Sequence, residues 1–271
     1  MSALESKSGV YVLTVVLILI FLLSMRSDRD SVREKEQKKG ADLQSEETFS
    51  GSLLEEINHK EDKENKKVFL TFDDGPTEHT AEVLGILENY GIPATFFVIG
   101  NQVTEETELL LQQAVAQGCE IGVHTQCHQA EKIYLSAQSF YKDVMAAKKV
   151  IEDSTGEKVC WFRFPWGSNN CYVSSYRQQI ISMLKEEGLE YVDWNVSGED
   201  SVGRPDAYTI FSNVKKDTEI AKSPVILLHD SEINEETVKA LPQIIEYYLD
   251  QGYSFANLGE RDKPCHFLES Q

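Results

Sequence analysis

Two adjacent carboxylates are the first residues of this sequence that could do chemistry. Asp73 and Asp74 directly follow the apolar run 68–72, which is typical of a buried parallel strand, and precede a turn-forming Gly-Pro pair. In α/β proteins, active sites are built at the C-terminal ends of such strands. Neighbouring strand residues point to opposite sides, so the two aspartates can take different roles. Asp-rich turns are also common without any function, so this motif needs support from elsewhere in the chain.

That support comes from two histidines four positions apart, His124 and His128, in the segment HTQCH. If they lie one helical turn apart, both imidazoles can ligate one ion. Two histidines and one carboxylate form the ligand set of a catalytic zinc site, which keeps one coordination position for water. A pair of surface histidines is the alternative interpretation, and the aspartate pair favours the metal site. Cys127, between the histidines, is interpreted as a bystander.

Two more segments follow in order, FRFPWG at 162–167 and VILLHD at 225–230. Together with TFDDGP and HTQCH, they resemble the ordered motifs of the polysaccharide deacetylases, the NodB-homology domain of carbohydrate esterase family 4. The resemblance extends over roughly residues 67–259, and four of the five family motifs match closely. Several motifs in a fixed order are far more specific than any one of them.

The resemblance implies a metal-dependent hydrolase. One divalent ion, expected to be zinc, would be held by Asp74, His124 and His128. Asp73 would be the base that takes a proton from water, and His229 the acid that protonates the departing amine.

Three further roles follow from the same resemblance. Arg163 would orient Asp73 and keep it ionised through a charge-assisted hydrogen bond. The backbone N–H of Trp166, where the family has Tyr, would bind the oxyanion. Leu227 would line the pocket for the acetyl methyl group, although it could equally be an ordinary core residue.

The fourth family motif, Asp-x-x-Asp-Trp, matches weakly and in two registers. One register uses the Asp193-Trp194 pair. The other uses SGEDS at 197–201, retains the second Asp as Asp200, and replaces the first Asp and the Trp with Ser. The spacing to the neighbouring elements favours the second register, so Asp200 is the expected partner of His229 and Asp193 the alternative.

Composition limits the function classes. The chain has 271 residues, 41% of them hydrophobic, and a formal net charge of -19. This charge argues against nucleic-acid binding, which normally requires a basic face. Five cysteines in a chain of this length do not form a secreted disulfide framework. Cys160 and Cys171 could pair across the Arg163 loop in an oxidising compartment.

The N-terminal region predicts membrane attachment. Residues 9–25 are almost wholly apolar and reach the short end of a membrane span. No small-x-small cleavage site follows, so an uncleaved anchor is favoured over a signal peptide. Residues 26–66 are rich in Lys, Glu, Asp, Gln and Ser and are expected to form an extended stalk. Lys and Arg are denser after the anchor than before it, which by itself predicts a cytoplasmic domain. The resemblance implies the opposite side.

The domain at 67–259 alternates strands and helices, which predicts a parallel sheet, and residues 260–271 are expected to be a C-terminal tail. The resemblance implies a distorted (β/α) barrel with fewer than eight units. Asp143 is expected on the solvent side of its helix. Strands are expected at 68–72, 94–99, 119–123, 159–162, 189–196, 224–228 and 253–258, and helices at 80–90, 105–117, 139–153, 174–187, 206–219 and 234–250.

These observations together predict a membrane-anchored, monomeric, metal-dependent polysaccharide N-deacetylase. The expected substrate is N-acetylglucosamine of peptidoglycan, with chitin-type oligomers next. One alternative is an O-deacetylase acting on acetylated xylan or a similar polymer. The other is a metal-free carbohydrate-binding pseudoenzyme, which the altered fourth motif would permit.

Overall fold

The computed structural model describes residues 66–267. The expected membrane anchor at 9–25 and all but the last residue of the expected stalk lie outside the described residues. Among the helices that are described, none is both long and apolar enough to cross a membrane.

Strands and helices alternate along the described chain, as the sequence predicts. The strands are β1 (Lys67–Gly75), β2 (Thr95–Val98), β3 (Glu120–Val123), β4 (Trp161–Phe162), β5 (Glu190–Tyr191), β6 (Val196–Ser197), β7 (Val225–His229) and β8 (Ser254–Phe255). The helices are α2 (Glu78–Tyr90), α3 (Glu108–Ala116), α4 (Ala130–Ile133), α5 (Ala137–Thr155), α6 (Arg177–Glu186), α7 (Ala207–Thr218) and α8 (Glu235–Asp250), with short 3₁₀ turns at Gly100–Gln102 and Leu258–Glu260.

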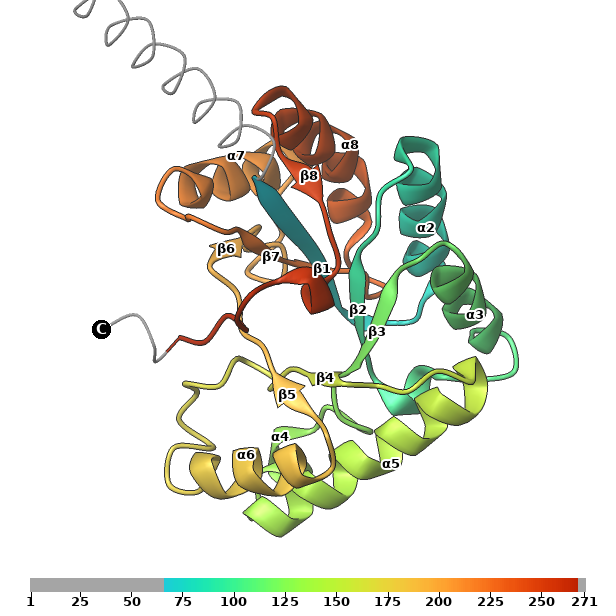
Figure 1. Cartoon of the computed structure of the whole chain (residues 1–271), viewed down its shortest axis with the longest axis vertical. Coiled ribbons are helices and arrows are strands. Elements are labelled where there is room, and N and C mark those ends of the chain that lie inside the picture. Colours follow the sequence, from blue (N-terminus) through green and yellow to red (C-terminus); the bar gives the residue numbers. More distant parts are fainter. Residues whose placement is uncertain (1–65, 268–271) are drawn as a thin grey trace, which may run out of the picture. The chain divides into compact units, whose positions relative to one another are not determined.

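The strands form one parallel sheet in the order β5-β4-β3-β2-β1-β7-β6, and β8 pairs with the start of β1. The helices lie around the outside of the curved sheet (Figure 1). The larger hydrophobic core lies between the sheet and these helices, and a smaller cluster that includes Phe69, Phe97 and Val225 lies apart from it. β1 is central in this order, so Asp73 and Asp74 are flanked by the ends of β2 and β7.

The barrel is open because β5 and β6 do not pair with each other. The sequence predicted one strand in this region, and that prediction is wrong. The expected strand 189–196 is two separate strands at opposite ends of the sheet: β5 pairs with β4, and β6 pairs with β7. Between them, the Asp193 N–H donates to the Cys265 carbonyl, and Asn195 exchanges hydrogen bonds with Val225. Residues 192–195 therefore cross the gap instead of extending a strand.

Part of the expected C-terminal tail is also integral to the domain. In Figure 1 the last described residues pass between β5 and β6. The Phe267 N–H donates to Asp193 Oδ2 at 3.1 Å, and the Cys265 carbonyl accepts from Asp193. Residues 265–267 therefore close the side of the barrel where β5 and β6 do not pair.

Local capping explains where the helices begin. Thr77 caps α2 through a reciprocal pair of hydrogen bonds with Thr80, a capping box. Asp206 caps α7 by accepting from the Thr209 N–H at 2.8 Å, which confirms the expected helix start. Cys160 and Cys171 are exposed free thiols in the described structure, so the disulfide that the sequence allowed is not formed.

Candidate active site

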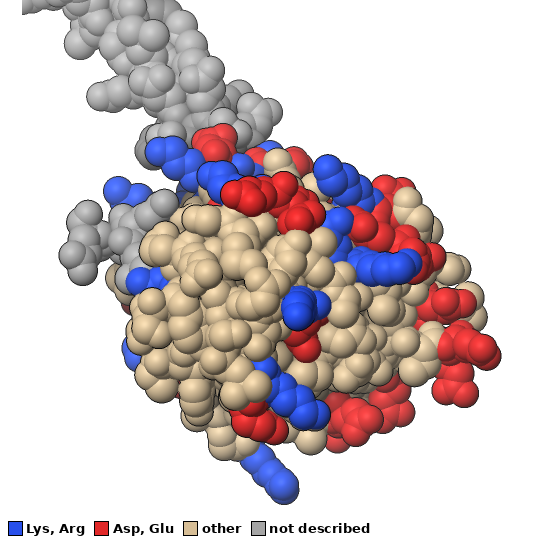
Figure 2. Space-filling model, turned by 90° about the horizontal axis from the view of Figure 1, so that it is seen from below, with Lys and Arg blue, Asp and Glu red and all other residues tan. Residues whose placement is uncertain are grey.

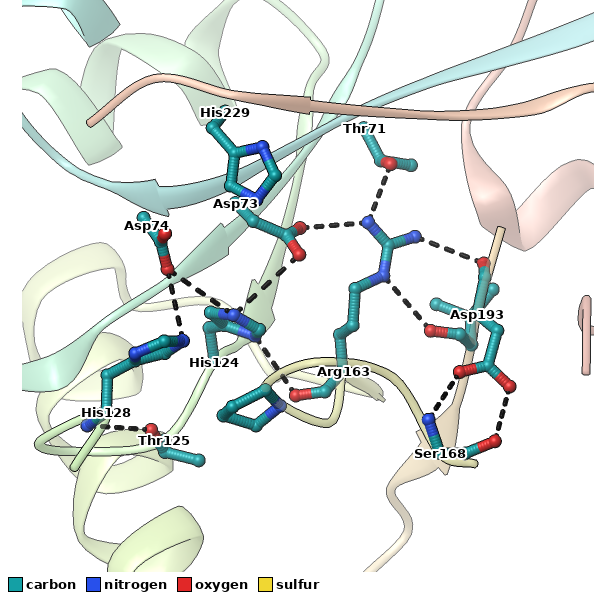
Figure 3. Close-up of polar contacts among 12 residues, drawn as sticks. Thr71, Asp73, Asp74, His124, Thr125, His128, Arg163, Ser168, Asp193 and His229 are labelled. Atoms are coloured by element: carbon teal, nitrogen blue, oxygen red, sulfur yellow. Dashed lines mark hydrogen bonds and ion pairs between the residues drawn. The ribbon is translucent and has the colours of Figure 1, made fainter. Parts of the chain in front are cut away.

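The strand register brings the central residues together. Asp73 of β1 is in register with His229 of β7, and Thr71 with Leu227. In-register residues of parallel strands point to the same face, as do residues two apart on one strand. The side chains of Thr71, Asp73, Leu227 and His229 therefore share one face, and Figure 3 shows His229 beside Asp73.

Asp74, His124 and His128 converge on one point. Asp74 Oδ1 lies 3.4 Å from His124 Nε2 and 3.4 Å from His128 Nε2. One ligand atom from each residue lies within 4.8 Å of the other two, and Figure 3 shows the three side chains facing one another. Two imidazole nitrogens and one carboxylate oxygen at this separation can hold a divalent ion.

Two further observations fit a metal at this point. Asp74 Oδ1 is buried and accepts no hydrogen bond among the described residues, a costly state for a carboxylate oxygen unless something else binds it. His124 Nδ1 lies 3.1 Å from the Arg163 carbonyl, so this nitrogen carries the proton and Nε2 is available as a ligand. Burial first, and then the positive charges near it, hold the pKa of His124 well below its usual value. The neutral ring is the form that ligates metals.

The two histidines are placed by a loop and not by a helical turn as expected. Residues 124–129 lie between β3 and α4. Thr125 and His128 adopt left-handed backbone conformations, with φ of 71° and 48°. Asp74, Trp166 and Glu199 also have positive φ. Non-glycine residues in this region each cost on the order of 1–3 kcal/mol and cluster at functional sites, and all five lie at or next to the residues that the sequence analysis singled out.

Arg163 is fully buried and binds Asp73. Its Nη1 donates to Asp73 Oδ1 at 2.8 Å and to Thr71 Oγ1 at 2.7 Å, and its other nitrogens donate to the backbone carbonyls of Val192 and Asp193. Burial raises the pKa of Asp73, and the guanidinium opposes that shift. Because Oδ1 is held by Arg163, Oδ2 is the oxygen that can exchange a proton.

Asp200, and not Asp193, contacts His229. Asp200 Oδ1 lies 2.8 Å from His229 Nδ1, and Oδ2 accepts from the His229 N–H and from Thr237 Oγ1, each at 2.7 Å. Burial lowers the pKa of His229, but the hydrogen bond and charge of Asp200, with the charges of Asp73 and Asp74, outweigh it and raise the pKa to about 9.

Asp193 has a different environment. Its carboxylate accepts from the N–H and the hydroxyl of Ser168, at 2.9 and 2.6 Å, and from the Phe267 N–H. It therefore ties the loop that follows Trp166 to the C-terminal residues in the barrel gap, as Figure 3 shows for Ser168.

The two remaining predicted residues lie at the same end of the sheet. Leu227 is buried on β7 between Thr71 and Ser197 in register. Trp166 is 49% exposed, and its ring centroid lies 4.8 Å from that of His128. Within the described part of the chain, its backbone N–H takes part in none of the hydrogen bonds that order the loop, so it can serve as a donor to a ligand.

Three supporting residues were missed by the sequence analysis. Thr71 accepts a hydrogen bond from Arg163, and Thr237 donates one to Asp200. Asp143 was expected to face solvent, but it is half-buried and accepts from the Gln126 N–H at 2.6 Å, inside the loop between the two histidines. Because it lies 17 residues further along the chain, no local pattern in the sequence connects it with that loop.

The sequence and the fold are also similar to those of known proteins. The family model described as polysaccharide deacetylase matches residues 60–192. A peptidoglycan-N-acetylglucosamine deacetylase of Bacillus cereus is 34% identical over 204 residues, which cover 72% of this chain and 88% of that protein.

Two other relatives widen the comparison. A bifunctional xylanase/deacetylase of Pseudobutyrivibrio xylanivorans is 34% identical over 195 residues, but the chain spans only 30% of its length. The crystal structure of the catalytic domain of a peptidoglycan N-acetylglucosamine deacetylase from Eubacterium rectale is 31% identical, with a TM-score of 0.69. That match covers 74% of this chain and 92% of the solved one.

Proposed function

This chain belongs to the polysaccharide deacetylase family and is a deacetylase, and we propose that it removes N-acetyl groups from N-acetylglucosamine of peptidoglycan. The observation that carries the proposal is the convergence of Asp74, His124 and His128 beside Asp73 and His229. Asp73 is paired with Arg163, and His229 is paired with Asp200. Peptidoglycan is favoured as substrate because two of the similar proteins act on it by name.

In the proposed reaction, water attacks the acetyl carbonyl carbon, and the amide bond between that carbon and the nitrogen on the sugar breaks. Asp73 Oδ2 accepts the proton of the attacking water while Oδ1 stays bound to Arg163. The Trp166 N–H donates to the oxygen that becomes negatively charged in the tetrahedral intermediate. Leu227 offers an apolar surface to the acetyl methyl group.

His229 completes the reaction by protonating the departing amine nitrogen. With a pKa raised to about 9, its ring is protonated at neutral pH and can act as the acid. Asp200 binds Nδ1, so Nε2 is the nitrogen that delivers the proton. The products are acetate and a free amine on the polymer.

We propose that Asp74, His124 and His128 hold one divalent ion, zinc in the first instance because the donors are two imidazoles and one carboxylate. When bound, such an ion polarises the acetyl carbonyl and increases the acidity of water.

We also propose that the chain is attached to the membrane by residues 9–25 and acts as a monomer on its outer side, where peptidoglycan lies. Protease added to intact spheroplasts should then release a soluble domain by cutting within 26–66. Protection of the domain from the protease would mean that the basic residues after the anchor hold it in the cytoplasm.

The substrate proposal is tested by acetate release from purified peptidoglycan, N-acetylglucosamine oligomers and acetylated xylan, each with the zinc-loaded protein. We expect release from peptidoglycan and, more slowly, from the oligomers. Fastest release from acetylated xylan would identify an O-deacetylase, an alternative that the similarity to the bifunctional xylanase/deacetylase keeps open. Absence of release from all three would favour the pseudoenzyme.

A further inference from the structure

Two large aromatic rings lie exposed next to the candidate metal site. Trp166 is 49% exposed and Tyr172 is 54% exposed. Their ring centroids are 5.9 Å apart, with an angle of 54° between the planes. Trp166 touches the His128 ring, whereas the aromatic neighbours of Tyr172 among the described residues are Trp166 and Tyr134. Tyr172 therefore lies one ring further from the metal site than Trp166.

These rings are held in place by ring stacking and by a partly buried hydrogen-bond network. Tyr172 is stacked on the buried Tyr134 ring at 5.7 Å, with only 6° between the planes. Asn170 accepts from the Tyr172 N–H at 2.9 Å and donates to the carbonyls of Pro165 and Gly167. Tyr134 donates its hydroxyl to the same Pro165 carbonyl. A surface that is already ordered loses less entropy when a ligand binds.

The surroundings indicate the chemistry of the ligand. Segment 164–176, which carries both rings, contains no charged residue, although the chain has a net charge of -19. Figure 2 views the molecule from the side of α5 and α6, and a broad area of that face carries no Lys, Arg, Asp or Glu. An uncharged surface with exposed aromatic faces suits a neutral ligand with an apolar face of its own. A pyranose ring is such a ligand, because its axial C–H groups can pack on the π-face of an aromatic ring.

We propose that Tyr172 and the Trp166 ring form a stacking platform for a sugar next to the one that is deacetylated. This inference rests on the proposed function for the position of the reacting sugar. The platform makes the protein prefer a polymer to a single sugar, since a monosaccharide at the metal site does not reach Tyr172. Tyr172 is a binding residue in this proposal and takes no part in proton transfer.

The test compares three variants on a five-sugar N-acetylglucosamine oligomer. We expect Tyr172→Ala to raise KM about tenfold, which corresponds to about 1.4 kcal/mol of lost stacking, with kcat within about twofold. Tyr172→Phe should behave like the unchanged protein, because stacking does not need the hydroxyl. Tyr208→Ala is the matched control: Tyr208 is 72% exposed and lies on α7, which packs on α8 and β6. Melting temperatures should agree across the set.

The outcomes distinguish a failure of the stacking platform from a failure of the proposed function. If the unchanged protein releases acetate and Tyr172→Ala has an unchanged KM, the platform is wrong and the proposed function stands. If the unchanged protein releases no acetate from any polymer, the proposed function fails. Calorimetric binding of the same oligomer then decides the platform. Weaker binding to Tyr172→Ala than to Tyr208→Ala supports it, and equal binding overturns it.

Discussion

Replacing Asp200 with Asn should shift the pH dependence of turnover. Asp200 accepts hydrogen bonds from both the ring and the backbone N–H of His229, and its charge is a principal reason that the pKa of this histidine is about 9 and not the usual 6.5. A raised histidine pKa means that the protonated form is favoured, so the acid is available at every pH below about 9. Asn keeps the shape but removes the charge, so only Asp73 and Asp74 still oppose the effect of burial, and the pKa should fall toward the usual 6.5.

The magnitude follows from the protonated fraction. At pH 7.5 nearly all of His229 is protonated with a pKa of about 9, whereas about a tenth is protonated with a pKa of 6.5. Asp200→Asn should therefore lose about tenfold in kcat at pH 7.5, and more if the ring also loses its orientation. The loss should shrink as the pH is lowered toward 6, and the melting temperature should change little because Asn can still accept from Thr237.

The assay is kcat against pH from about 5.5 to 10 on one oligosaccharide, with zinc content measured for each preparation. Asp193→Asn is the matched control, because Asp193 is also a buried carboxylate but binds Ser168 and Phe267 and not His229. Its alkaline limb should stay near pH 9, even if its rate or stability falls. An alkaline limb that remains near 9 in Asp200→Asn would refute the reasoning. A limb that moves only in Asp193→Asn would refute it as well.

Three further predictions concern the metal site and its base. The purified domain should bind about one equivalent of zinc by metal analysis, and the His124→Ala/His128→Ala double variant should bind none; equal zinc in both would exclude this site. Asp73→Asn should lose nearly all acetate release and keep the zinc, because its Oδ2 is assigned to proton transfer and not to the ion; loss of zinc would reverse the assignment of the two aspartates. Asp143→Ala should weaken zinc binding about tenfold in a competition titration, because the Gln126 N–H in the loop between the histidines loses its hydrogen-bond acceptor. An unchanged affinity would show that Asp143 does not support the metal site.

Short-range signals in the sequence were sufficient for most of the fold. Apolar runs of strand length such as 68–72, and turn signals such as the Gly-Pro pair after Asp74, predicted strands alternating with helices, and this alternation predicted a parallel sheet. The same local logic predicted that Asp73, Asp74 and His229 lie at strand ends on one edge. Each of these inferences depends on neighbours within a few residues, which is the range over which a single sequence carries a clear pattern.

What the sequence left open depended on pairing between distant segments. The local sequence predicted one strand at 189–196. In the structure, backbone N–H groups of this segment donate to the carbonyls of Val225 and Cys265, so the segment crosses the barrel gap. No local pattern in the sequence reveals these distant acceptors. The spacing of His124 and His128 suggested a helix, whereas a loop bound by Asp143 holds them. Two registers of the fourth motif gave two candidate partners for His229.

The spacing in the sequence favoured Asp200, and the tertiary structure shows that Asp200 is the partner. Asp193 and Asp200 are seven positions apart, and both are buried acids in the same stretch of chain. The pairing of β6 with β7 carries Asp200 to His229, while the crossing segment leaves Asp193 on Ser168 and Phe267. The sequence by itself determined which residue types could do the chemistry. Which of the two candidate carboxylates reaches the histidine was decided by long-range strand pairing, because that pairing sets the direction and distance of each side chain.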